Sequence, residues 1–198
     1  LQALLERATS VPSLVRAAPT TLRAMGAPTA LIDYIQAPHD DLLSADLKWL
    51  EAPNHHIVTW GSPQYPALLT QLDDAPVGLY VRGDPNMLSL PQLAIVGSRN
   101  PTPSGRENAY EFAAHLGRCG LTITSGLALG IDAASHEGAL AGGGQTVAVC
   151  GTGLDIAYPR SNLALAEKIE EQGALVSEFP LGTPPLKANF PPRNRLIS

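Results

Sequence analysis

The sequence predicts a doubly wound α/β domain with a mostly parallel sheet, preceded by a small all-helical domain. Two patterns support this prediction. Short apolar runs alternate with helical stretches from residue 93 onward, whereas residues 1–53 contain only helical patterns broken by Pro and Gly. The chain has 198 residues, of which 44% are hydrophobic, and this is enough for a core of that size.

The first part of the chain has apolar residues at helical spacing. The predicted helices cover residues 1–8, 19–26, 29–36 and 40–52. We therefore expect one domain over residues 1–53 and a second over residues 54–198.

Two strands are predicted next, at residues 55–61 and 77–83. Between them, Pro63 and Pro66 are placed to start a short helix. We expect both strands to border a larger sheet.

The larger sheet is predicted from a regular alternation. Strands that are apolar on both faces and alternate with helices indicate a parallel sheet that is covered on both sides and joined by right-handed crossovers. This arrangement is Rossmann-like, and its ligands bind beyond the carboxyl ends of the strands. The predicted strands lie at 93–97, 121–126, 146–151 and 174–179, with helices near 105–118, 130–141 and 161–172.

Several classes of protein are excluded by composition. No apolar run is long enough to span a membrane and no signal-peptide pattern begins the chain, so we expect a cytoplasmic protein without a membrane partner. Cys119 and Cys150 form no CxxC motif, and the five histidines have no metal-ligand spacing. We expect both thiols in the core, no metal and no cofactor.

The formal net charge of -5 argues against a nucleic-acid partner, because affinity for phosphate chains comes largely from Lys and Arg. The distribution of charge changes this conclusion. Residues 179–198 carry Lys187, Arg193 and Arg195 and no acidic residue. Such a segment is compatible with a local anion site, although a solvated charged face is the alternative.

The loop after the first parallel strand, "GSRNPTPSGRE", lacks the GxGxxG dinucleotide pattern, and no GxxxxGK[ST] motif occurs in the chain. Arg99 follows the strand directly, and its guanidinium is suited to binding phosphate. Its alternative role is a salt bridge across the end of the sheet.

Acidic residues and a histidine also follow the strands. Asp132 and His136 lie four residues apart on one predicted helix, which makes a catalytic pair conceivable. We favour a capping and packing role, because no activated nucleophile is nearby. Asp155 could meet a ribose or a cation, or bond its own backbone, and the role of Glu178 is open.

The last loop, "LKANFPPRNR", places Lys187 three residues before Phe190. We expect this proline-rich stretch to be too extended to bury the phenylalanine. A cation beside an exposed aromatic ring suits single-stranded nucleic acid, because the charge holds a phosphate and the ring stacks on a base for about 1–3 kcal/mol. The alternative is that Phe190 pins the loop to the core.

Five segments resemble, in order and spacing, the DNA-processing protein A (DprA or Smf) family of bacterial natural transformation. The resemblance is strong over residues 55–198, and residues 1–52 look like the SAM-like helical domain of that family. The segments are "LAIVGSRNPTPSG", "TSGLALGIDAASHEGAL", "TVAVCGTGLDIAYPRSN", "SEFPLGTPP" and "NFPPRNRLIS".

The resemblance implies an extended Rossmann-like domain that binds and protects single-stranded DNA without sequence preference, dimerises, and helps to load RecA recombinase for recombination. Arg99 and Lys187 would hold phosphates and Phe190 would stack on a base, whereas one of the two C-terminal arginines could be structural. No catalytic residue is expected. The implied DNA-binding residues are Ser98, Arg99, Ser125, Gly126, Lys187, Asn189, Phe190, Arg193, Asn194 and Arg195.

The family continues beyond the last residue of this sequence through a strand and a helix, so we expect a fragment that lacks the C-terminal part. Two alternatives to DNA binding remain. One is a nucleotide-processing enzyme of the phosphoribohydrolase type, although "CGTGLD" has no glutamate where that group has PGGxGTxxE. The other is a protein scaffold that recruits RecA.

Overall fold

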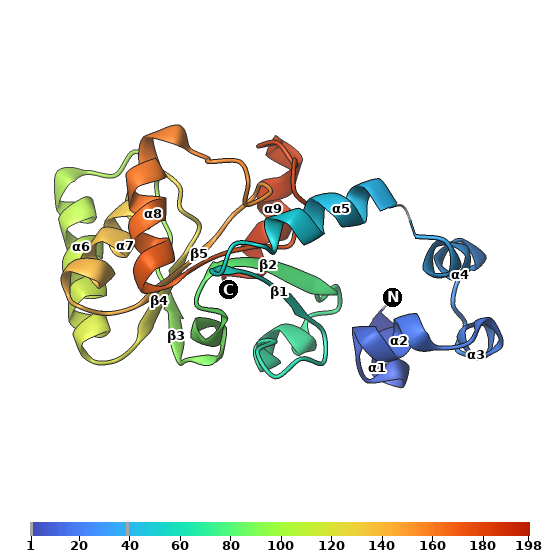
Figure 1. Ribbon diagram of the computed structural model, residues 1–198. Coiled ribbons are helices and arrows are strands. Elements are labelled where there is room, and N and C mark those ends of the chain that lie inside the picture. The colour runs from blue at the N-terminus through green and yellow to red at the C-terminus, as the bar shows by residue number, and fades with distance from the viewer. Residues whose placement is uncertain (1, 39) are drawn as a thin grey trace.

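The computed structural model describes residues 2–38 and 40–198 (Figure 1). The N-terminal segment is helical, as predicted, and it includes one short helix, α2, that the pattern did not predict. Figure 1 shows α1 to α4 grouped at one end of the molecule, with α5 leading from them to the sheet. The helices are α1 (Gln2–Ala8), α2 (Val11–Arg16), α3 (Pro19–Ala24), α4 (Thr29–Gln36) and α5 (Asp40–Trp49).

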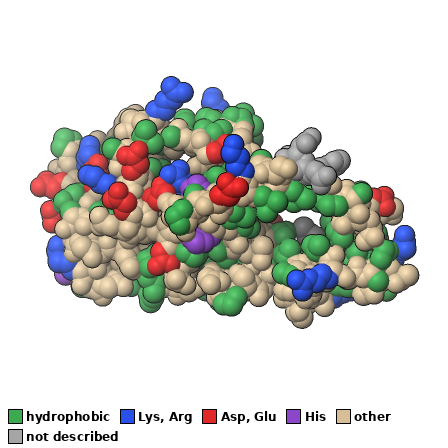
Figure 2. Space-filling model, in the orientation of Figure 1, with side chains coloured by type: hydrophobic (Ala, Val, Ile, Leu, Met, Phe, Trp, Pro, Cys, Tyr) green, Lys and Arg blue, Asp and Glu red, His purple; other side chains and the backbone are tan. Residues whose placement is uncertain are grey.

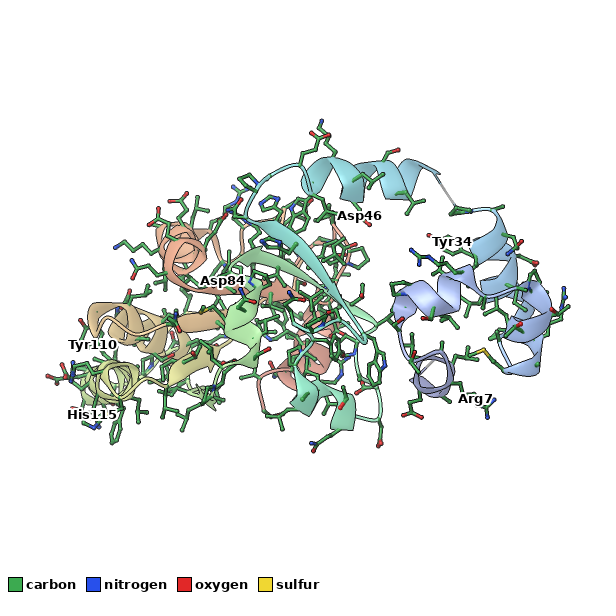
Figure 3. The ribbon with its side chains drawn as sticks, turned by 60° about the horizontal axis from the view of Figure 1, so that its bottom comes forward. Arg7, Tyr34, Asp46, Asp84, Tyr110 and His115 are labelled. Atoms are coloured by element: carbon green, nitrogen blue, oxygen red, sulfur yellow. The ribbon has the colours of Figure 1, made fainter. Side chains whose placement is uncertain are left out.

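The helical segment packs against the rest of the chain. Leu5 and Leu22 are almost fully buried and belong to the same hydrophobic cluster as Val81 of the sheet. Asp46, which is labelled in Figure 3, lies on α5, and its side chain accepts a hydrogen bond of 3.0 Å from the hydroxyl of Tyr80. Continuous apolar packing and this hydrogen bond fix the helices to the sheet.

The described residues form a six-stranded sheet in the order β1-β2-β6-β5-β4-β3. β1 and β2 form an antiparallel hairpin, β2 is antiparallel to β6, and the remaining pairs are parallel. The prediction of a mostly parallel sheet bordered by two further strands is confirmed. The strands are β1 (His55–Thr59), β2 (Gly78–Gly83), β3 (Gln92–Ala94), β4 (Thr122–Ser125), β5 (Thr146–Val149) and β6 (Ala174–Ser177).

Three helices connect the parallel strands: α6 (Pro103–Arg118), α7 (Ile131–Ala141) and α8 (Leu163–Gln172). The strand order from β3 to β6 is sequential, so right-handed crossovers place all three helices on one face. This corrects one detail of the prediction. A doubly wound sheet has connecting helices on both faces, whereas the helices that connect the parallel strands within the described residues all lie on one face. An apolar strand shows that both faces are buried, but not what buries each face.

The other face of the sheet is covered by chain that surrounds the hairpin. Val147 and Val176 point to this face and share a hydrophobic cluster with Met87 and Leu88. Met87 and Leu88 lie in the 3-10 helix Pro85–Ser89. A second 3-10 helix, Ala67–Gln71, lies in the segment that joins β1 and β2. The latter is the short helix predicted after Pro63 and Pro66.

The C-terminal segment is more compact than predicted. A 3-10 turn, Lys187–Asn189, leads directly into the short helix α9 (Phe190–Asn194). Pro191 and Pro192 occupy its first turn, where proline is tolerated because those N–H groups have no partner inside the helix. The prediction of an extended stretch is therefore wrong.

Two further expectations were that both cysteine thiols lie in the core and that the chain does not span a membrane. Cys150 is buried as predicted, whereas Cys119 is exposed because it caps the C-terminus of α6 at the surface. Across the described residues, no helix has the length and apolar character needed to cross a membrane.

Candidate nucleic-acid interface

The loops that follow the parallel strands meet at one edge of the sheet, because parallel strands all end on the same side. In Figure 1 this is the upper edge, where α9 lies and α8 begins. A cavity of about 60 Å³ opens there. Its lining residues are Arg99, Gly126, Ala128, Leu129, Gly151, Tyr158, Pro159, Phe190 and Arg193.

Phe190 lines this cavity and is half-buried. Its ring packs directly on Gly151, where an added Cβ would lie 2.9 Å from the ring atom Cδ1. The guanidinium carbons of Arg99 and Arg193 are each 5.7 Å from the ring centroid, within the range of a cation–π interaction. Phe190 therefore anchors α9 and also presents part of its ring at the surface.

Arg193 is an interior residue, with only 4% of its surface exposed. Its Nη1 donates to the carbonyl of Gly126 at 2.8 Å and to the carbonyl of Val149. Burial lowers the pKa of Arg193, and the nearby charge of Arg99 contributes in the same direction. The guanidinium links α9 to the ends of β4 and β5.

Gly126 makes room for Arg193. A Cβ at this position would lie 2.8 Å from Nη2 of Arg193 and 2.8 Å from Oδ2 of Asp132. The backbone N–H of Gly126 donates to Asp132 at 3.1 Å, and its carbonyl accepts from Arg193. Both backbone groups of Gly126 are thus used inside the protein.

Arg195 is paired with acidic residues. Its Nη1 and Nη2 donate to the two carboxylate oxygens of Glu178 at 2.5 and 2.6 Å, and its Nε lies 2.9 Å from Asp74. The hydrogen bonds with Glu178 are the main cause of the raised pKa of Arg195. This cluster joins the end of α9 to β6. The role of Glu178, which the sequence left open, is to bind Arg195.

Three of the other predicted residues also make contacts within the protein. The hydroxyl of the fully buried Ser125 donates to a backbone carbonyl of the loop after β3 at 2.6 Å. The amide of Asn189 donates to two carbonyls, at 3.1 and 3.2 Å. The exposed Ser98 accepts a hydrogen bond of 3.1 Å from the N–H of Asn100.

Asn194 is exposed, and its side-chain oxygen accepts from Nε of Arg193 at 3.1 Å. Arg99 and Lys187 are both exposed, and neither takes part in a salt bridge among the described residues. Figure 2 shows Lys and Arg side chains protruding from the upper edge, near the position of α9 in Figure 1. Of the four predicted cations, the structure presents two to solvent.

Asp132 and His136 do not form a catalytic pair. A carboxylate oxygen of Asp132 accepts from the N–H groups of Gly126 and Ala128, at 3.1 and 3.4 Å. His136 is fully buried, with its Nδ1 2.6 Å from Oγ1 of Thr146, and burial lowers its pKa to about 3. The packing role favoured for His136 is confirmed, whereas the capping role favoured for Asp132 is wrong, because Gly130 is the N-cap of α7 and Asp132 bonds N–H groups that precede the helix.

Asp155 bonds the backbone of another loop rather than its own backbone, which was one of its two alternatives. Both of its carboxylate oxygens lie 2.9 Å from the N–H of Gly182, so it ties two loops of the edge together. Within the described part of the chain, no group of three His, Cys, Asp or Glu side chains could hold a metal ion.

Five residues that line the cavity were not predicted from the sequence, and these are Ala128, Leu129, Gly151, Tyr158 and Pro159. Tyr158 is 41% exposed and Leu129 is 45% exposed. A signal for Tyr158 was present, because "YPR" places an aromatic residue two positions from Arg160, much as "KANF" pairs Lys187 with Phe190. Nothing in the sequence distinguishes Leu129 from a core leucine.

These features define an α/β protein whose glycine-rich, cationic loops gather at the carboxyl edge of a mostly parallel sheet. The chain belongs to the DNA recombination-mediator protein A family, whose model matches residues 56–198. The predicted family is therefore confirmed.

Two relatives show the extent of the similarity. Protein Smf of Escherichia coli K12 is 47% identical over 157 residues, which are 79% of this chain and 42% of that protein. DNA processing protein DprA of Streptococcus pneumoniae R6 is 43% identical over 134 residues, which are 68% of this chain and 47% of that protein. The chain thus spans less than half the length of these relatives.

Two solved structures are also similar. The X-ray structure of DprA from Streptococcus pneumoniae has a TM-score of 0.81 at 33% identity, covering 98% of this chain and 67% of that one. DNA processing protein A from Helicobacter pylori, studied for its single-stranded DNA binding mode, has a TM-score of 0.65 at 34% identity. That match covers 72% of this chain and 64% of the other.

Proposed function

We propose that the chain binds single-stranded DNA, without sequence preference, at the carboxyl edge of its parallel strands. One observation carries the proposal: two exposed cations, Arg99 and Lys187, accompany the partly exposed ring of Phe190. The charges would hold phosphates and the ring would stack on a base. The Helicobacter pylori relative, which binds single-stranded DNA, supports this proposal.

The chemistry of these groups accounts for a lack of sequence preference. Phosphates are the same at every nucleotide, and every base has a π face that can stack on Phe190. We assign Ser98 and Asn194, both exposed, to the margin of the DNA site. The remaining members of the predicted set are buried or partly buried and act by positioning the loops, and these are Ser125, Gly126, Asn189, Arg193 and Arg195.

We extend the proposal to the cell on the basis of family membership. The protein would act in the cytoplasm during natural transformation, protect incoming single strands as a dimer, and promote loading of RecA. Residues 1–53 would form the SAM-like domain and residues 54–198 the DNA-binding domain. The role is binding rather than catalysis, since Asp132 and His136 are used in internal contacts.

The proposal is tested by fluorescence anisotropy with labelled oligo-dT and with a mixed-sequence oligonucleotide of the same length. We expect equal affinity for both. Arg99→Ala and Lys187→Ala should each weaken binding and reduce the slope of log affinity against log salt by about 0.7, the value for one phosphate contact on a single strand.

Arg118→Ala is the matched control. Arg118 is exposed, carries the same charge, and lies at the C-terminal end of α6, on the opposite edge of the sheet. It should leave affinity and salt slope unchanged. Binding by the Arg99 and Lys187 variants that equals that of the unaltered chain would contradict the proposal.

A further inference from the structure

We propose that Tyr158 and Arg160 form a second aromatic and cationic pair, which extends the DNA site from Phe190 so that it binds two successive nucleotides. This inference rests on the proposed function. It assigns to Tyr158 the stacking of a second base and to Arg160 the binding of a further phosphate.

The first support is the position of Tyr158. It lines the same cavity as Phe190, and the centroids of the two rings are 5.9 Å apart. In Figure 1 the segment that leads into α8, which contains Tyr158, runs along the upper edge toward α9. The two rings therefore belong to one continuous surface.

The second support is exposure. Phe190 is half-buried and contacts Gly151, with arginine side chains near its ring, whereas Tyr158 is 41% exposed. The other exposed aromatic side chains among the described residues, Tyr34 and Phe112, lie on α4 and α6. Tyr158 is thus the ring that the cavity presents most openly to a ligand.

The geometry of the rings favours successive bases over one base between them. Carbon atoms in contact are separated by about 3.5–4.0 Å, so a base inserted between two rings needs about 7 Å between parallel planes. The observed centroids are 5.9 Å apart and the ring planes are inclined by 38°. Each ring can instead carry its own base, as in grooves that bind single strands.

The third support is Arg160. It is exposed and begins the 3-10 turn Arg160–Asn162, two residues after Tyr158. Arg82, Arg106 and Arg195 each form a salt bridge, whereas Arg160 forms none with the described residues. Its charge is available to a phosphate, which repeats the pairing of Lys187 with Phe190.

The test compares three variants at one position. Tyr158→Leu keeps apolar packing beside Phe190 but removes the aromatic face, and Tyr158→Ala removes the whole ring. We expect each to lower affinity for oligo-dT by about 5- to 150-fold, the range for one stacked base, and Tyr158→Phe to recover that loss. Arg160→Ala should reduce the salt slope by about 0.7.

A direct readout is photo-crosslinking of the unaltered chain to oligo-dT that carries a single 5-bromodeoxyuridine, followed by mass spectrometry. We expect crosslinks on peptides containing Tyr158 and on peptides containing Phe190. Melting temperatures of the variants, together with Arg118→Ala, control for folding and for loss of charge.

Two outcomes of these experiments separate failure of the second pair from failure of the proposed function. If Arg99→Ala and Lys187→Ala weaken binding but Tyr158→Leu does not, and Tyr158 does not crosslink, the second pair is wrong and the proposed function stands. If the unaltered chain does not bind oligo-dT, the proposed function fails and the second pair fails with it.

Discussion

Two pairs of cationic side chains share the carboxyl edge of the sheet and differ in what they contact. Arg193 and Arg195 are held by backbone carbonyls and carboxylates of the protein. Arg99 and Lys187 are exposed and form no salt bridge among the described residues. The number of cations near a strand end therefore overstates the number of phosphates that the edge can bind.

The largest expected effect is at Arg193, the buried member of the pair that bonds within the protein. Arg193→Ala leaves the carbonyls of Gly126 and Val149 without their donor, so we expect a loss of about 3 kcal/mol in the free energy of unfolding. Chemical denaturation measures it. Arg193→Met, which keeps most of the volume, should still lose about 2 kcal/mol. A loss below about 1 kcal/mol in both variants would remove the distinction between the two pairs.

Arg195→Ala should have the next largest effect. It removes the hydrogen bonds with Glu178, whose side chain is only 15% exposed, and we expect a loss of about 2 kcal/mol in the free energy of unfolding. Glu178→Gln in the same denaturation series tests the other partner. If neither variant loses stability, the ion pair is not what fixes α9 to β6.

His136 tests the interior of the same domain by pH. Its pKa is lowered from 6.5 to about 3 in the fold, so between these values the unfolded chain binds one more proton than the folded chain. Stability is full above pH 6.5 and is lost as the pH falls, by about 2 kcal/mol at pH 5. The difference between unfolding of the unaltered chain and of His136→Gln, at pH 7 and pH 5, isolates this contribution. Equal pH dependence would show that His136 is accessible to protons in the fold.

The smallest expected effect on stability is at the exposed pair. Arg99→Ala removes an exposed cation beside Phe190, so its free energy of unfolding should change by less than about 0.5 kcal/mol. Thermal unfolding measures it alongside Arg193→Ala. Losses of similar size would mean that Arg99 is as structural as Arg193.

Much of the fold could be predicted from the sequence. The strands and helices between residues 121 and 177 lie within about two residues of their predicted positions, because their apolar periodicity is strong. The order of the strands was not predictable, since tertiary pairing decides it. The helix at Phe190–Asn194 was missed because proline disfavours a helix interior but is accepted in a first turn.

The sequence was enough to predict which edge of the sheet holds the site, but not which of its cations bond within the protein. Loops at the carboxyl ends of parallel strands must meet, so the sequence alone is enough to place Arg99 and Phe190 at the same edge. An arginine, however, has the same sequence signature whether it bonds a carbonyl or a phosphate. The interior role of Arg193 follows only from the packing of α9 on β4 and β5.

The most direct test is a crystal structure of this chain with a short oligo-dT. The account predicts phosphate oxygens within hydrogen-bond distance of Arg99 and Lys187, a base on Phe190, and Arg193 still bonded to the carbonyls of Gly126 and Val149. A strand bound at another surface, or phosphates held by Arg193 or Arg195 after their internal bonds have broken, would contradict it.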